Sequence, residues 1–169
     1  MNINIELSTS SVQRAIEQIK AYQDSLNDKN DLFVQRLAEL GIPIIDENIH
    51  ASAGDANKYH STQIKINSFG DHSEATLTLS GQDILFIEFG SGIYYNKNSS
   101  VAHAGEFGYG VGTYPGQTHA FDEQGWWYKD ETGAPHHSYG QQATAPMLKA
   151  SHEIIENIRK IAREVYGSK

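Results

Sequence analysis

The sequence predicts an α+β fold in which an antiparallel sheet is flanked by a helical N-terminal segment and a C-terminal helix. Three observations predict it. Apolar residues recur at helical spacing through most of residues 8–51, the spacing changes to two over residues 64–79, and a second helical pattern closes the chain. The chain has 169 residues and shows neither an internal repeat nor a linker, so we expect a single domain, 1–169.

The N-terminal region is predicted to be a short strand followed by helices. Apolar and polar residues alternate over residues 3–7, which is typical of a half-buried strand. A cluster of serine and threonine then supplies N-caps for a helix whose apolar stripe spans residues 12–26. The polar residues 27–30 predict an interruption, and Gly41 fits a helix end. Pro43 suits the first position of a further short helix.

The central region is predicted to form the sheet. Ile64 and Ile66 alternate with polar residues, a polar turn follows at residues 70–72, and a second alternating run lies beyond it, so this is an antiparallel hairpin. Residues 83–89 are almost continuously apolar and β-prone, which predicts a third strand in the middle of the sheet. The C-terminal helix is predicted to begin at Pro146.

A long irregular insertion is predicted between these elements, at about residues 90–145. It contains ten of the 15 glycines and ten of the 17 aromatic residues, and only residues 126–129 resemble a strand, ended by turn residues 130–133. Connections of this length are rare in compact domains unless they are functional or disordered. Disordered segments are depleted in aromatic residues, so we expect a large surface to hold these rings in place.

Composition excludes several classes of function. The net charge of −8 leaves no basic excess to neutralise phosphates, so we expect no sequence-specific nucleic-acid partner. The absence of cysteine excludes disulfides, thiolate metal sites and cysteine nucleophiles. No signal peptide is expected at the N-terminus, and the apolar run at residues 84–87 is far too short to span a membrane. We therefore expect a soluble protein made inside a cell, with no membrane partner.

Histidines are the candidate metal ligands. His103, His119, His136 and His137 all lie in the irregular insertion. Zinc sites usually present ligands in pairs at short fixed spacings, whereas the sequence contains no HExxH motif, and His136 and His137 would point in different directions on an extended strand. The prediction is no metal site and no cofactor.

Glu88 and Glu106 are the candidate catalytic carboxylates. If they converged in a cleft beside aromatic residues, they would resemble the paired carboxylates of a glycosidase, so a small carbohydrate-active enzyme or sugar-binding module is the alternative function. A chain with 21 acidic residues contains such pairs by chance, and Glu88 equally suits the capping of a turn at residues 90–92. We expect no enzymatic activity and assign no catalytic residue.

Two further segments do not match a phosphate-binding loop or a serine nucleophile motif, because required residues are missing from the necessary positions. The glycine-rich run 105–116 has neither the lysine nor the following helix of a phosphate-binding loop. Ser91 lies between glycines after an apolar run, but its surroundings do not match the GxSxG motif that presents a serine nucleophile.

The same segments, taken in order, resemble a known family pattern. The order is Ile87–Gly92, then Gly108–Tyr109, Gly125–Tyr128, a Tyr-Gly-Gln segment at residues 139–141, and Ala145–Met147 before the last helix. This resembles the minor tail-component family of long-tailed bacteriophages, also called tail-completion or head–tail joining proteins. In that family an EFGTG strand end, a GWWY strand and a PFM-like helix start recur in this order. The chain departs from the pattern in having serine for threonine at Ser91, and it lacks the usual arginine and phenylalanine around Pro146.

The resemblance implies a non-enzymatic virion component, made in the host bacterial cytoplasm, that completes the tail or joins it to the head. It implies other neck or tail subunits as partners and a homo-oligomeric ring. Aromatic side chains on a glycine-rich extension suit contacts with such partners. The expected interface residues are Tyr94, Tyr95, Phe107, Tyr109, Tyr114, Phe121 and Trp126. The alternative is that these rings cover the protein's own sheet, and one of the two adjacent tryptophans is expected to lie in the core. A minor capsid or decoration protein is a third possibility.

Overall fold

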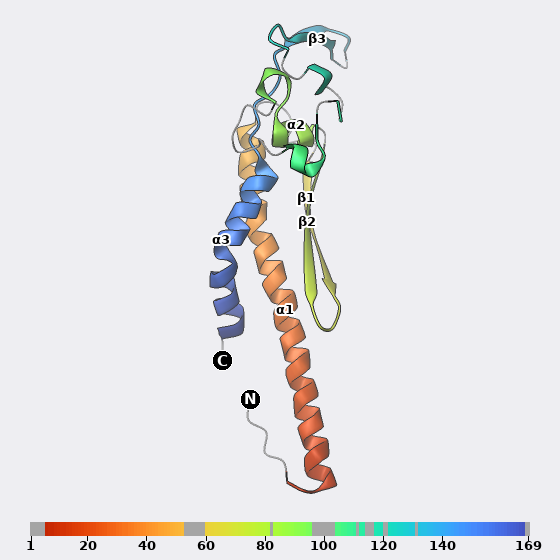
Figure 1. Ribbon diagram of the computed structural model, residues 1–169, viewed down its shortest axis with the longest axis vertical. Helices are drawn as coiled ribbons and strands as arrows, with labels where there is room; N and C mark the ends of the chain where they lie inside the picture. The colour runs from red at the N-terminus through yellow and green to blue at the C-terminus, as the bar shows by residue number, and fades with distance from the viewer. Residues whose placement is uncertain are drawn as a thin grey trace.

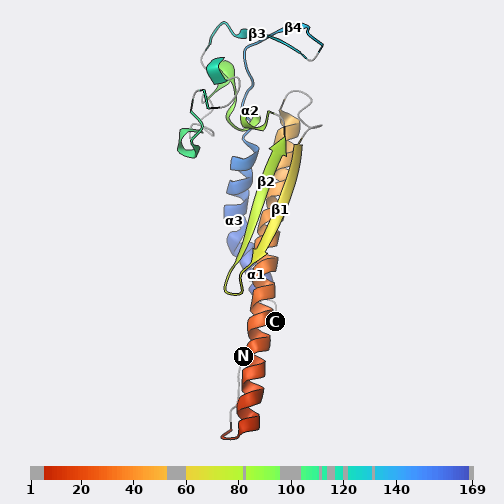
Figure 2. The ribbon, with the colours of Figure 1, turned by 90° about the vertical axis from the view of Figure 1, so that its right-hand side faces the viewer.

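The computed structural model describes residues 6–52, 60–81, 83–95, 104–110, 112–113, 117–119, 122–130 and 132–167. It has an α+β fold, as predicted (Figure 1). Two helices and a β-hairpin pack side by side along one axis, and a smaller hairpin lies at one end of the molecule (Figures 1 and 2). The predicted strand at residues 3–7 falls largely outside the described residues.

Helix α1 (Thr9–Ala51) is continuous, so the predicted interruption at residues 27–30, the helix end at Gly41 and the new helix at Pro43 are wrong. Extending a helix adds one hydrogen bond for each residue fixed, and this outweighs the weak propensities of a short polar run. Around Gly41 and Pro43 the helix is held from two sides. A Cβ atom built on Gly41 would touch both the hairpin and the C-terminal helix, which shows how closely these elements approach α1.

The first hairpin is formed by β1 (His60–Ser68) and β2 (Ser73–Gly81), and it confirms the predicted hairpin. The strands are antiparallel, with Ile64 opposite Leu77 and Ile66 opposite Ala75. These side chains are half-buried because they face α1, while the alternate residues are mostly exposed.

Residues 84–89 form a short helix, α2 (Ile84–Phe89), so the predicted third strand is wrong. A short apolar run suits a buried helix as well as a buried strand, and periodicity does not separate the two. Instead of one larger sheet, the described residues contain two separate two-stranded sheets. The second consists of β3 (Trp126–Lys129), which was predicted, and β4 (Pro135–Ser138), which was not.

The described residues of the insertion also form three short 3-10 helices, η2 (Gly92–Tyr94), η4 (Ala104–Phe107) and η5 (Gln117–His119). Helix α3 (Pro146–Gly167) begins where the sequence predicted and packs lengthwise on α1. Two core clusters meet at α2. Ile87 packs with Ile45, Ile49 and Ala150 between the long helices. Phe89 packs in the second cluster, whose other buried residues come from the insertion: Tyr95, Ala104, Ala143 and Ala145.

Candidate functional site

Three of the motif segments noted in the sequence, far apart along the chain, meet at the N-terminus of α3. They are residues 88–92 at the end of α2, residues 139–141 after β4, and residues 145–147 at the start of α3. Hydrogen bonds join the first segment to each of the other two. We call this place the junction, because it connects the helical body to the second hairpin.

Within the junction, Glu88 connects the end of α2 to the start of α3. Its side chain is only 8% exposed, and its carboxylate accepts the backbone N–H groups of Met147 at 2.8 Å and Leu148 at 3.0 Å. The first N–H groups of a helix have no partner within the helix, and negative charge is favoured there. Burial raises the pKa of Glu88, and the two N–H donors together with the nearby Lys149 oppose that rise. Both carboxylate oxygens of Glu88 are thus engaged in capping α3, rather than the turn at residues 90–92.

The backbone of residues 91–93 is paired with the segment that follows β4. The Ser91 N–H donates to the Gln141 carbonyl at 2.9 Å, and the Gln141 N–H donates to the Ser91 hydroxyl at 2.8 Å. Gly140 makes this approach possible, since its φ is +104° and a Cβ atom there would lie 2.0 Å from the Ser91 carbonyl oxygen. Ser91 therefore has a structural role in the junction.

The structure separates the predicted interface residues into different environments. Tyr94 and Phe107 are exposed, and Trp126 and Tyr109 are half-buried. Tyr95 is buried in the second core cluster, where its hydroxyl donates to the Tyr109 carbonyl, so it packs within its own chain. Two further predicted interface residues, Tyr114 and Phe121, lie outside the described residues, as does the side chain of Glu106.

Aromatic and histidine rings pack together on the second hairpin and beside it. His119 stacks on Trp126 with ring centroids 4.7 Å apart, His136 lies against Tyr128, and His137 packs edge-on against Trp127. Trp127 is 70% exposed, whereas Trp126 is half-buried and lines a cleft, so the two neighbours face different surroundings. Neither belongs to a core cluster, so the prediction that one of them lies in the core is wrong. These histidines contact rings, and the described residues contain no group of three or more histidine, aspartate or glutamate side chains placed to hold a metal ion. His103 lies outside the described residues.

A cleft of about 1020 Å³ lies between the junction, the second hairpin and the end of α1. Tyr94, Trp126 and Tyr128 contribute aromatic surface to it, and Gln141 and Lys149 contribute polar groups. Glu88 does not line this cleft. It lines a smaller apolar pocket of about 330 Å³ on α3, together with Leu79, Phe107 and Leu148.

Two exposed apolar surfaces were not predicted as interaction sites. One is the N-terminal half of α1, with Val12, Ile16, Ile19 and Tyr22. The other is on α3, with Ile155 and Ile158. Their helical spacing was visible in the sequence, but an apolar stripe looks the same whether it faces the protein's own core or solvent.

Comparison with protein-family models, with curated proteins and with solved structures found no match for this chain. Within the part of the chain that the structure describes, no helix combines the length and the apolar character needed to cross a membrane.

Proposed function

We propose that this chain is a non-enzymatic assembly protein of a long-tailed bacteriophage, acting in tail completion or head–tail joining through protein–protein contacts. The observation that carries the proposal is the distribution of exposed apolar side chains over an elongated molecule. They are concentrated on the N-terminal half of α1, on α3 and on the second hairpin. Large exposed apolar surfaces are typical of sites that bind other proteins.

The chemistry of the junction supports the same proposal. Each residue that the sequence suggested as a catalytic group and that the structure describes has a structural partner instead. Glu88 caps α3, and Ser91 bonds the segment after β4. The ordered motifs that resemble the tail-component family are thus used to fix one hairpin onto a helical body.

The test is electron microscopy of a lysate from a phage that carries an early stop codon in this gene. The expected result is DNA-filled heads with separate or aberrant tails, with the protein absent from the particles. Supplying the intact gene from a plasmid should restore infectious particles, which controls for effects on neighbouring genes. Normal infectious particles from the stop-codon phage would overturn the proposal.

A sugar-binding module is the second candidate, supported by the aromatic and amide groups of the large cleft. Aromatic rings pack on the apolar faces of sugar rings, and amides bond their hydroxyl groups. In a glycan-binding screen, this function predicts a ligand whose binding is lost on Trp126→Ala and kept on Trp127→Ala, because only Trp126 lines the cleft. The assembly proposal predicts no glycan ligand.

A further inference from the structure

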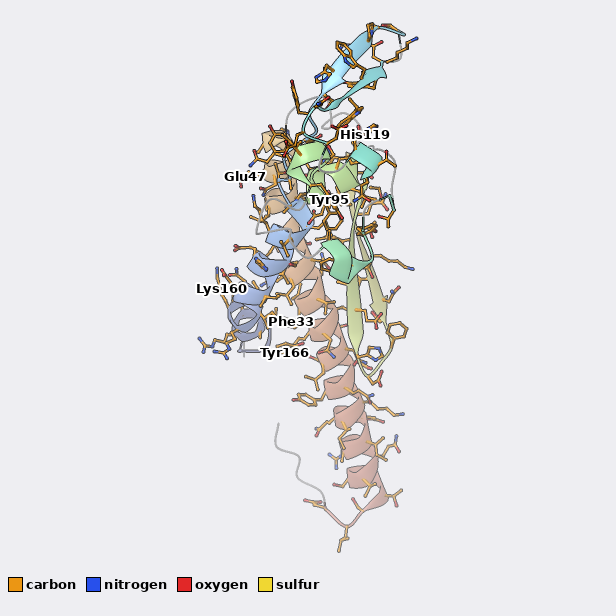
Figure 3. The ribbon with its side chains drawn as sticks, turned by 45° about the horizontal axis from the view of Figure 1, so that its top comes forward. Phe33, Glu47, Tyr95, His119, Lys160 and Tyr166 are labelled. Atoms are coloured by element: carbon orange, nitrogen blue, oxygen red, sulfur yellow. The ribbon has the colours of Figure 1, made fainter. Side chains whose placement is uncertain are left out.

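The N-terminal half of α1 extends past both of its partners in the chain. At the end of α3, the Tyr166 hydroxyl donates to Asn30 at 2.7 Å and its ring packs on Phe33 (Figure 3). At the tip of the first hairpin, the hydroxyls of Ser68 and Ser73 donate to the carboxylate of Asp31 at 2.5 and 2.6 Å. Beyond this level, residues 9–25 of α1 extend past both elements (Figures 1 and 2). We call residues 9–25 the arm.

The arm continues the face of α1 that packs on α3. Val12, Ile19 and Phe33 are separated by multiples of seven residues, so they lie on the same side of the helix, and Phe33 contacts α3. On the arm, four large side chains of this face are exposed, with values of 46% for Val12, 42% for Ile16, 52% for Ile19 and 50% for Tyr22, whereas the small residues Ser11 and Ala15 beside them are buried. The face of an internal interface thus continues for several turns into solvent.

A second apolar surface runs along α3, from the apolar pocket to two exposed isoleucines. Leu148 and Ser151 line the apolar pocket, and Ile155 and Ile158 follow them at helical spacing. Ile155 is 63% exposed and Ile158 is 40% exposed. We call Leu148, Ser151, Ile155 and Ile158 the α3 strip.

We infer that the arm of one copy packs lengthwise against the α3 strip of a second copy. The lengths match: the exposed apolar residues of the arm span positions 12–22 and the α3 strip spans positions 148–158, which is 11 positions or about 16 Å of helix for each. A single contact covers both exposed surfaces. Pairing of two arms would cover only one of them, leave Ile155 and Ile158 in water, and bury less of the area that a stable interface needs.

Charge favours the same pair of surfaces. The whole chain has a net charge of −8, which opposes self-association. The arm, however, contains two acidic and two basic residues, and α3 contains three acidic and four basic residues. Two copies can therefore approach through these surfaces with little electrostatic repulsion.

An arm-to-strip contact joins two different surfaces, so each copy offers one free arm and one free strip. Such a head-to-tail contact generates a ring when its rotation closes. The inference deepens the proposed function by naming the surfaces that join two copies, and the expectation that the ring closes rests on that proposed function. The contact itself is measured on the purified chain, so its failure leaves the result of the phage experiment untouched.

The first experiment compares glutamate substitutions by sedimentation velocity over a concentration series. Ile19→Glu on the arm and Ile155→Glu on the α3 strip are each expected to weaken self-association at least about tenfold. Ala21→Glu, exposed on the opposite side of the arm, introduces the same side chain and should associate like the wild type. A wild-type chain that stays monomeric at high concentration would overturn the inference.

The second experiment mixes the two defective variants. Ile155→Glu keeps an intact arm, and Ile19→Glu keeps an intact strip, so the mixture should form a one-to-one dimer that neither forms alone. Arm-to-arm pairing predicts no such dimer and normal association of Ile155→Glu, and either observation would overturn the inference.

A third measurement does not depend on disrupting the interface. The chain has no cysteine, so a variant with both Ile19→Cys and Ile155→Cys contains only two thiols. Under mild oxidation it should form disulfide-linked multimers. The matched variant with Ala21→Cys and Ile155→Cys should stay uncrosslinked, and equal crosslinking of both variants would contradict the proposed contact.

Discussion

The two halves of α1 share a helical pattern of apolar residues and differ in what covers them. In the C-terminal half, Ile45 and Ile49 are fully buried between α2, α3 and the first hairpin. In the arm, Ile16 and Ile19 are about half exposed. Amphipathic spacing therefore identifies a face that needs a partner, and the ends of α3 and of the hairpin decide which part of that face finds one within the chain.

The largest expected difference in stability comes from making the same substitution, isoleucine to alanine, in each half of α1. Ile45→Ala should lower the free energy of unfolding by about 3 kcal/mol, because it leaves a cavity in the core. Ile19→Ala should change the free energy of unfolding of the monomer by less than about 0.5 kcal/mol, because the side chain is exposed. Urea unfolding measures both. Similar losses would mean that the arm is covered within the monomer.

A smaller loss is expected when α3 loses its cap. Glu88→Ala leaves two N–H groups at the start of α3 without their acceptor and should lower the free energy of unfolding by about 2 kcal/mol. Glu47→Ala, an exposed carboxylate on α1, is the matched control and should have almost no effect. If the two variants unfolded alike, the role of Glu88 in attaching α3 to the covered half of α1 would be refuted.

Hydrogen exchange should sharpen the comparison without removing a core contact. In the Ile155→Glu variant, expected to be monomeric, amides of residues 16–25 should exchange at least about tenfold faster than amides of residues 36–50, because this part of the arm extends past α3 and the first hairpin. In the associated wild type, the arm should be protected. Arm amides that exchange equally slowly in both proteins would show that the arm has its partner within the chain.

The smallest expected effect is a change in the pKa of Asp31, which lies at the boundary between the two halves of α1. Hydrogen bonds from Ser68 and Ser73 lower the pKa of Asp31 below its usual 3.8. A depressed pKa in the folded state contributes stability above the unfolded value, and this contribution is lost as the pH falls below about 4 through the folded value. In an NMR titration, Ser73→Ala should raise the pKa of Asp31, whereas Ser80→Ala, farther along the same strand, should not.

Several features were predictable because they depend on local spacing. The first hairpin, the strand at residues 126–129 and the start of α3 follow from alternation, aromatic content and a proline at a helix start. The prediction of a strand at residues 83–89 was wrong because an apolar run of this length suits either element, and packing between the long helices selected a helix. The role of Glu88 was not predictable, since its partners lie about 60 positions away in the sequence.

The sequence by itself determined the α+β class, the amphipathic faces of both long helices and the exclusion of cysteine chemistry, because these depend on composition and on the period of apolar residues. Only the tertiary structure decided which parts of those faces are covered. It placed the ends of α3 and of the first hairpin at Asn30 and Asp31, and it brought Glu88 to the start of α3. The physical reason is that burial depends on contacts between distant segments, whereas periodicity depends only on neighbouring residues.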